Sequence, residues 1–149
     1  MKFYLYKYIQ KEDAFLRYLH EADWKAGNLL YRTLKDGTFH TRFGQTAELY
    51  FLLDGEQIVG FGAIVEQDFF PIPEIKRFLA FLYVDHAYRG RYLSRKIIRH
   101  LEETVLSRGE TEVHILTQHK GLYEKMNYAL VREVEDGVHE HAYLYTKNL

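Results

Sequence analysis

The sequence predicts a mixed α+β fold: a central, mostly antiparallel sheet of about seven strands, one parallel strand–helix–strand unit and about four flanking helices. Two observations support this prediction: a hairpin signal in the first half of the chain and a helical crossover in the second. The hairpin signal is Asp54-Gly55, which separates two apolar runs at 47–53 and 56–65. Asp-Gly between apolar runs is a strong signal for two antiparallel strands joined by a tight turn.

The crossover begins with residues 77–84 (RFLAFLYV), which are nearly all apolar, as expected for a strand buried on both faces. A helix is predicted over 91–108, with a one-faced apolar stripe that ends before Gly109. Residues 112–117 form the next strand. Two strands joined in this way must be parallel and connected by a right-handed crossover.

The other elements follow from hydrophobic periodicity and from turn residues. Helices are expected at 11–22, 24–35 and 120–126, and strands at 2–9, 129–134 and 139–146. Residues 66–76 contain both prolines and should form a loop. The chain of 149 residues has the length of one domain and contains no linker or repeat, so we expect a single domain over 1–149.

Composition excludes several functional classes. There are 20 Lys and Arg residues against 21 Asp and Glu, a formal net charge of −1, so the basic excess of a general nucleic-acid binder is absent. Cysteine is absent, which excludes a disulfide scaffold, a zinc ribbon and a cysteine nucleophile, and fits a cytoplasmic location. Charged residues interrupt the amino-terminal apolar segment, and no run of about 18 apolar residues occurs, so neither a signal peptide nor a membrane span is expected.

The start of the 91–108 helix carries an unusual concentration of positive charge. Its first turns contain Arg91, Arg95, Lys96 and Arg99, and Arg89 lies just before them. Cations at the amino terminus of a helix oppose its dipole, unless an anion binds there to the free N–H groups. The pattern therefore indicates a ligand that carries phosphate, although a solvated basic face would look the same. The glycines of a Walker loop and of a dinucleotide fingerprint are absent.

The segment Tyr88-Arg-Gly-Arg-Tyr-Leu-Ser94, between a buried strand and a helix, resembles the acetyl-CoA loop of the GNAT superfamily of N-acetyltransferases. That family's pattern is Arg/Gln-x-x-Gly-x-Gly/Ala. Arg89 matches its first position and Ser94 its small final position, while Tyr92 stands where a glycine is usual. A side chain at this position could crowd the phosphates of the donor or could point away from them.

A second segment supports the same resemblance. Leu122-Tyr-Glu-Lys-Met-Asn-Tyr128 is similar to the family's Phe/Leu-Tyr-Glu-Lys-x-Gly-Phe, and it follows the 112–117 strand, where the family places it. Asn127 replaces the usual glycine, and Asn tolerates a left-handed backbone better than other residues that have a side chain. The order of the expected elements also agrees with a GNAT-like fold.

The resemblance implies an acetyl-CoA-dependent N-acetyltransferase that moves the acetyl group directly to a primary amine of a small molecule or peptide. Tyr123 would protonate the departing CoA thiolate; the alternatives are a packing role for Tyr123 and His119 as the proton carrier. Two parallel strands would splay apart, and backbone groups of the first would bind pantetheine. The residues implied to bind acetyl-CoA are Leu82, Tyr83, Val84, Arg89, Gly90, Arg91, Tyr92, Leu93 and Ser94.

The acceptor side is less defined by the sequence. Asp68 is our candidate for the residue that binds or deprotonates the amine, and Glu48 is the alternative, because each lies at the end of a hairpin strand. Trp24 and the pair Phe69-Phe70 could wall the acceptor pocket or belong to the core.

Several alternatives stay open. One is a GNAT-like acyl-CoA-binding or sensor domain with little turnover, which Tyr92 motivates, and another is a nucleic-acid-binding domain that uses the basic helix. A metal site at His139-x-His141 lacks an evident third ligand, and no metal is expected. The exposed carboxy-terminal strands are compatible with a homodimer.

Overall fold

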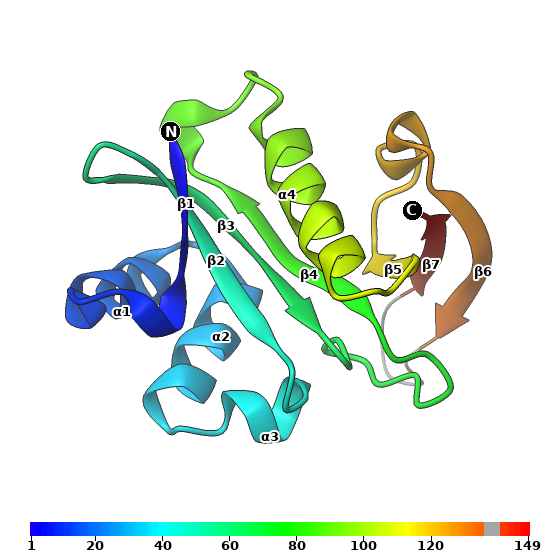
Figure 1. Cartoon of the computed structure of the whole chain (residues 1–149), viewed down its shortest axis with the longest axis horizontal. Coiled ribbons are helices and arrows are strands. Elements are labelled where there is room, and N and C mark those ends of the chain that lie inside the picture. Colours follow the sequence, from blue (N-terminus) through cyan, green and yellow to red (C-terminus); the bar gives the residue numbers. More distant parts are fainter. Residues whose placement is uncertain (136–140) are drawn as a thin grey trace.

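The computed structural model describes residues 1–135 and 141–149. Its seven-stranded sheet has the order β1-β2-β3-β4-β5-β7-β6, and β4 and β5 form its parallel pair (Figure 1). The strands are β1 (Lys2–Leu5), β2 (Glu48–Asp54), β3 (Gln57–Val65), β4 (Phe78–Val84), β5 (Glu112–Thr117), β6 (Ala129–Glu135) and β7 (His141–Asn148). The helices are α1 (Glu12–Glu21), α2 (Lys25–Lys35), α3 (Phe39–Phe43) and α4 (Leu93–Ser107), with 3-10 turns η1 (Tyr6–Tyr8), η2 (His86–Tyr88) and η3 (Tyr123–Met126). The predicted fold class is confirmed.

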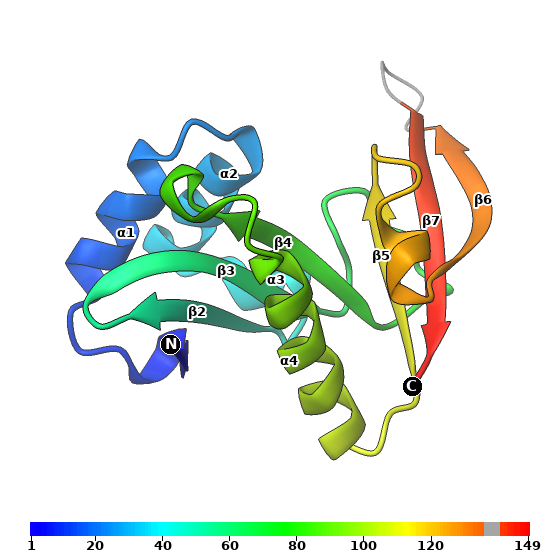
Figure 2. The same cartoon turned by 90° about the horizontal axis from the view of Figure 1, so that it is seen from above.

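Helices cover both faces of the sheet. Figures 1 and 2 show α1, α2 and α3 on one face and α4 on the other. Two apolar cores result: one beneath α1–α3, which includes Leu19, Phe51 and Phe61, and one beneath α4. The apolar stripe of α4 is buried as predicted, and its members are Leu93, Ile97, Ile98, Leu101 and Val105.

Three local predictions need correction. The first strand ends at Leu5, because Tyr6 turns its ring against Phe51 and starts η1. The long helix begins at Leu93, since Tyr92 has a left-handed backbone that an α-helix cannot contain. The five-residue helix α3 was not predicted, because little more than one turn leaves no periodic signal.

A β-bulge interrupts β4 opposite Gly62. The register pairs Phe61 with Tyr83 but Ala63 with Ala80, so Phe81 and Leu82 together face one residue of β3. Phe81 has φ of 54°, which is rare for a bulky residue and costs about 1–3 kcal/mol. A bulge bends its strand and increases the local twist.

Beyond this bulge, β4 and β5 separate. The two strands pair at Phe78 and His114, before the bulge, while β5 continues along β7 as far as Thr117 and Tyr143. Figures 1 and 2 show the two strands diverging toward their carboxyl ends. Splayed parallel strands were implied by the resemblance, and the bulge supplies the physical cause.

Two glycines of β3 let the backbone of β4 and the helix α4 approach closely. A Cβ atom at Gly60 would lie 2.4 Å from the Tyr83 carbonyl oxygen, and one at Gly62 would lie 2.8 Å from Cγ2 of Ile97. Both distances are shorter than packed atoms tolerate, and the first involves backbone that cannot rotate away.

We therefore expect Gly60→Ala to lower the free energy of unfolding by about 1–3 kcal/mol, the usual cost of overpacking. Gly27→Ala is the matched control, since a Cβ there meets its nearest neighbour at 3.4 Å and alanine favours the α2 helix. Urea unfolding of both variants measures the difference. Equal stability of the two variants would contradict the close approach at Gly60.

Candidate functional site

A groove of about 290 Å³ lies where β4 and β5 have separated. Its walls come from the end of β4, the loop before α4, the first turns of α4 and the η3 region. Nine of the predicted site residues line it together: Leu82, Tyr83, Val84, Arg89, Gly90, Tyr92, Leu93, Ser94 and Tyr123. Arg91 and Asp68 are not among the lining residues. The two sequence motifs, which are about 30 positions apart, therefore meet at one site.

The loop before α4 is shaped by two left-handed residues. Gly90 has φ of 82° and Tyr92 has φ of 57°. The Tyr92 side chain is 74% exposed, and the Arg95 guanidinium lies 5.3 Å from its ring centroid. The left-handed backbone explains why a glycine suits this position, and the exposed ring points toward solvent rather than into the core.

Arg89 is folded back against β4. Its Nε donates to the Val84 carbonyl oxygen at 3.0 Å, and its guanidinium lies 5.6 Å from the centroid of the Tyr83 ring. Arg91 stacks over Tyr88 instead, at 5.4 Å.

The cations at the start of α4 have no carboxylate partner among residues 1–135 and 141–149. Within the described part of the chain, no ion pair involves Arg89, Arg91, Arg95, Lys96 or Arg99. The positive end of the α4 dipole and the N–H groups of its first turn add to this charge. The loop therefore fits an anion such as a phosphate.

Tyr123 presents a phenol whose ring is fixed and whose hydroxyl is uncommitted. Its ring packs against those of Tyr128 and Tyr145, with centroids 6.0 and 6.1 Å away. Tyr128 donates to Glu102 and Tyr145 donates to Glu124, at 2.7 and 3.0 Å, whereas the Tyr123 hydroxyl has no hydrogen bond to the residues that the structure describes. Burial raises the pKa of Tyr123 to about 12, so the phenol holds its proton at neutral pH.

The rest of the second motif holds Tyr123 in place. Glu124 accepts hydrogen bonds from the Gly121 N–H and the Tyr145 hydroxyl, each at 3.0 Å. Asn127 has φ of 68°, which confirms the left-handed backbone expected there. Its neighbour Tyr128 donates its N–H to the Tyr123 carbonyl at 3.1 Å and closes the turn.

Asp68 lies in the loop after β3. One carboxylate oxygen accepts the Phe69 N–H at 2.6 Å. Burial raises the pKa of Asp68 to about 6, against the opposing effects of this N–H group and of Arg42. The negative charge of Asp68 in turn contributes to the raised pKa of Tyr123, so the two groups lie within electrostatic range of each other. A carboxyl with a pKa near 6 can accept a proton at neutral pH.

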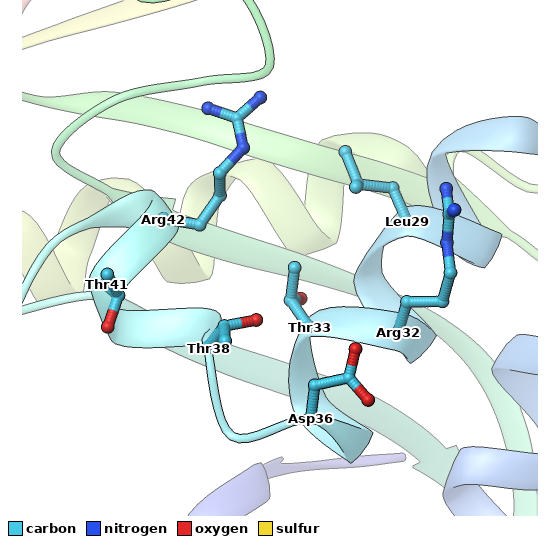
Figure 3. A pocket seen from close by; sticks show the side chains of 7 residues that line it. All are labelled: Leu29, Arg32, Thr33, Asp36, Thr38, Thr41 and Arg42. Carbon is cyan, nitrogen blue, oxygen red and sulfur yellow. The ribbon is translucent and has the colours of Figure 1, made fainter.

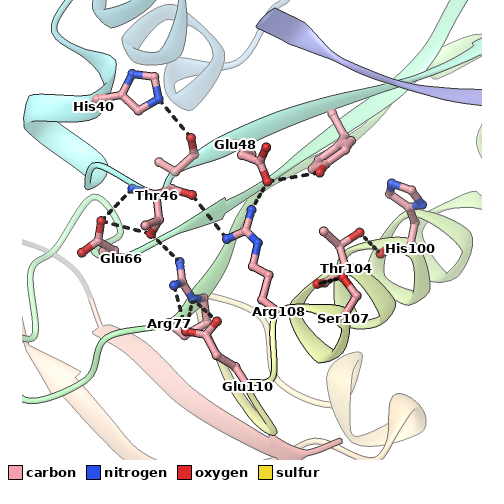
Figure 4. A network of polar contacts seen from close by, with 12 residues as sticks. His40, Thr46, Glu48, Glu66, Arg77, His100, Thr104, Ser107, Arg108 and Glu110 are labelled. Atoms are coloured by element: carbon pink, nitrogen blue, oxygen red, sulfur yellow. Dashed lines mark hydrogen bonds and ion pairs between the residues drawn. The ribbon is translucent and has the colours of Figure 1, made fainter.

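Glu48, the alternative acceptor carboxylate, is committed elsewhere. It forms an ion pair with Arg108 at the end of α4 and accepts a hydrogen bond from the Tyr50 hydroxyl. Figure 4 shows it in a polar network that also contains a two-pronged Arg77–Glu110 pair. This network ties the end of α4 to β2 and to the start of β4. Glu48 is therefore held in this network, and an acceptor role for it stays a prediction that the pairing disfavours.

The aromatic candidates divide between two places. Trp24 stacks on Tyr83, with ring centroids 5.3 Å apart, and so walls one side of the end of β4. Phe69 is 63% exposed, and its carbonyl accepts a hydrogen bond from Arg42 at 3.1 Å.

A second hollow lies apart from the predicted residues. It has about 420 Å³ between α2 and α3, and Figure 3 shows its lining, which includes Arg32, Thr33, Asp36 and Arg42. No residue predicted to bind acetyl-CoA or to act in catalysis lines this hollow.

Five groove residues were not predicted: Tyr88, Ile98, His119, Leu122 and Met126, of which His119 was named only as an alternative proton carrier. The signal for Leu122 and Met126 was their place in the second motif.

The suggested metal site at His139-x-His141 has no support in the described residues. His139 lies outside them, and His141 pairs with Glu133. Across 1–135 and 141–149, no group of three or more His, Cys, Asp or Glu side chains could hold a metal ion.

The sequence matches the family model described as Acetyltransferase (GNAT) family over residues 10–128. The chain is also similar in structure to an aminoglycoside 6'-acetyltransferase type Ii, with 15% identity, a TM-score of 0.72, and coverage of 99% of this chain and 97% of that one. A GNAT family acetyltransferase from Elizabethkingia anophelis with acetyl-CoA bound gives 13% identity, a TM-score of 0.64 and coverage of 99% and 97%. At these identities the likeness concerns the fold. None of the curated proteins matches the sequence.

Tyr92→Gly should raise the free energy of unfolding by about 0.5–1 kcal/mol. The left-handed backbone costs a residue with a side chain about 1–2 kcal/mol, which exceeds the roughly 0.5–1 kcal/mol that glycine loses in chain entropy. Arg91→Gly is the control, because Arg91 has no positive φ, and it should lower stability. Thermal and urea unfolding check both variants; destabilisation by Tyr92→Gly would refute the strain at Tyr92.

Proposed function

The chain belongs to the acetyltransferase (GNAT) family, and from this premise we propose that it moves the acetyl group of acetyl-CoA directly to a primary amine of a small molecule or peptide. The enzyme is an acetyl-CoA-dependent acyltransferase. The observation that carries the proposal is the groove that is lined together by the end of β4, by Arg89 and the first turns of α4, and by Tyr123. No helix in the described part of the chain is long and apolar enough to cross a membrane.

The donor would lie along the groove from the start of α4 to η3. The phosphates would meet the N–H groups of residues 90–94 and the cations around them, where the helix dipole favours negative charge. The pantetheine arm would bind backbone groups of Leu82, Tyr83 and Val84, which β5 no longer pairs. A backbone N–H aimed at the thioester carbonyl would stabilise the negative charge that develops there.

Two proton transfers complete the reaction. The amine nitrogen bonds to the acetyl carbon as the C–S bond breaks, Asp68 accepts the proton of the amine, and Tyr123 gives a proton to the departing sulfur. A phenol of pKa about 12 does not fully protonate a free thiolate of pKa roughly 8.5. The transfer must therefore be coupled to C–S cleavage, which requires a phenol that is already positioned and not committed to another acceptor.

The acceptor is proposed only as a class. Two similar structures are of aminoglycoside 6'-acetyltransferases, one of them in complex with coenzyme A. An acceptor panel should therefore contain an aminoglycoside beside spermidine, an amino acid and a peptide amino terminus. Thiol release from acetyl-CoA is the measurement, and release above hydrolysis with one amine supports the proposed transfer.

One observation favours a second candidate, an acyl-CoA-binding or sensor domain with little turnover. Tyr92 stands where the family usually has a glycine, in the loop between β4 and α4 (residues 85–92), which we call the donor loop. Binding of acetyl-CoA with no thiol release across the panel would support this candidate over the enzyme. We also propose a cytoplasmic location.

We further propose a homodimer that forms through the exposed strand β6, and light scattering would test this oligomeric state.

Arg89→Ala should weaken acetyl-CoA binding by about 1–3 kcal/mol, roughly 5- to 150-fold in Kd, the range for a charge-assisted hydrogen bond. Arg99→Ala removes the same charge from an exposed position two turns into α4 and should have the smaller effect. Calorimetric titration at low and moderate salt measures both. Equal losses would mean that only the general positive field of the helix matters.

Tyr123→Phe should lower the rate constant of transfer by a factor of about 10² to 10⁴, which is typical for loss of a general acid. Acetyl-CoA binding should change little, because the proton is needed as the thiolate departs. Tyr128→Phe is the control: it removes a neighbouring hydroxyl that is bonded to Glu102, so it should cost stability and leave the rate nearly unchanged. A wild-type rate in Tyr123→Phe would assign the acid to His119 or water.

Asp68→Asn should lower turnover while acetyl-CoA affinity stays nearly intact, and it should abolish the fall in rate below pH of about 6.

The same substitution should change the pH dependence of stability. Because the folded-state pKa of Asp68 is raised, its contribution to stability is present at low pH and is lost as pH rises from about 4 through about 6. Asn cannot ionise, so the variant gains stability relative to wild type over that interval. A pH–rate profile and urea unfolding at pH 3 and 7 check both expectations; equal loss of rate and donor affinity would indicate a structural role.

A further inference from the structure

A hydrogen bond between two side chains joins α1 to the loop that leads into α4. The Tyr18 hydroxyl donates to one carboxylate oxygen of Asp85 at 2.5 Å. The other oxygen of Asp85 accepts the Ala87 N–H at 3.0 Å, and the Asp85 N–H donates to the Val59 carbonyl at 2.7 Å. Asp85 is thus fixed at three points and directly follows the last residue of β4, Val84. Tyr18 reaches it from α1, in the helical layer on one face of the sheet.

The ionisation states make this a hydrogen bond from a neutral phenol to an anion. Burial and the neighbouring carboxylate raise the pKa of Tyr18 far above its usual value. The same hydrogen bond lowers the pKa of Asp85. Hydrogen bonds to an ionised partner are shorter and about twice as strong as neutral ones. The contact is therefore well suited to hold α1 in one position against the loop.

An aromatic stack attaches the same helical layer to the preceding residues of β4. The Tyr18 ring meets Phe61 edge-on, and Phe61 stacks on Tyr83 with centroids 5.1 Å apart. Trp24, which immediately precedes α2, stacks on the Tyr83 ring. The side chains of Leu82 and Val84 pack in the core beneath α4, whereas Tyr83 packs in the core beneath α1–α3.

This division of β4 places the two substrates on different sides. The cations Arg95, Lys96 and Arg99 lie on α4 itself, and Arg89 lies over the Tyr83 ring. An amine can therefore reach the thioester from the side of α1 and α2. We propose that Tyr18 is a positioning residue: through Asp85 it holds the α1–α2 wall of the acceptor site against the donor loop, so that acetyl-CoA binding and acceptor placement are coupled. The proposal rests on the proposed transferase function.

The first test needs no acceptor. Amide hydrogen exchange is measured with and without acetyl-CoA for the wild type, Tyr18→Phe and Tyr6→Phe. Tyr6 is the matched control, since its hydroxyl also donates to a carboxylate of α1, Glu12 at 3.0 Å, but away from the groove. In the wild type and in Tyr6→Phe, acetyl-CoA should slow exchange in residues 85–94 and in α1. In Tyr18→Phe the slowing at 85–94 should persist and that in α1 should be lost.

The second test divides the kinetic effect, with the panel amine that gives the highest thiol release as the acceptor. Tyr18→Phe should lower kcat/KM for that amine by about 10- to 100-fold, the effect of a small misplacement, and should leave the Kd of acetyl-CoA within about twofold. Asp85→Ala removes both acceptor oxygens and should lower kcat/KM for the amine at least as much as Tyr18→Phe does.

Protection of α1 that survives in Tyr18→Phe, or unchanged acceptor kinetics in that variant, would overturn the coupling while leaving the proposed function intact. Absence of protection at 85–94 in the wild type would contradict the donor site itself, and with it the coupling.

Discussion

One additional residue in β4, opposite Gly62, turns the end of that strand away from β5, and the groove exists because of this turn. Phe81 bears the strain of a left-handed backbone, and its ring packs edge-on against Phe43 in the core beneath α1–α3. That packing offsets a local cost of about 1–3 kcal/mol. Without the bulge, β5 would continue to pair with β4, and the backbone of residues 82–84 would be committed to the sheet.

Near this opening lie side chains whose charge or hydroxyl group is free to interact with a ligand. Among the described residues, the cations at the start of α4 have no carboxylate partner and the Tyr123 phenol has no hydrogen-bond partner. Arg89 and Tyr123 line the same groove. Asp68, in the β3–β4 loop, does not line the groove but lies within electrostatic range of Tyr123, and burial raises its pKa to about 6. Polar side chains elsewhere, such as the Arg108–Glu48 and Arg77–Glu110 pairs, are engaged with each other and stabilise the scaffold.

Periodic patterns and turn residues predicted most of the fold, because the α4 stripe and the Asp54-Gly55 hairpin are local signals. Residues of the two motifs also line one groove, and the roles assigned to them stay predictions. The choice between Asp68 and Glu48 was beyond the sequence, since the partner of Glu48 is 60 residues away, and the Tyr18–Asp85 bond spans 67 residues. The sequence contains no pattern that predicts the bulge. The bulge arises because β4 has one residue more than β3 between two paired positions, and this is visible only once the strands are paired.

The central claim is that acetyl-CoA binds in the opening that the bulge creates. Amide-resolved NMR titration of the wild-type protein with acetyl-CoA tests it most directly. The account predicts that the largest shifts fall on residues 82–84 and 90–94, with little change at residues 32–42 around the second hollow (Figure 3). Shifts concentrated at 32–42, with residues 82–84 unmoved, would contradict it.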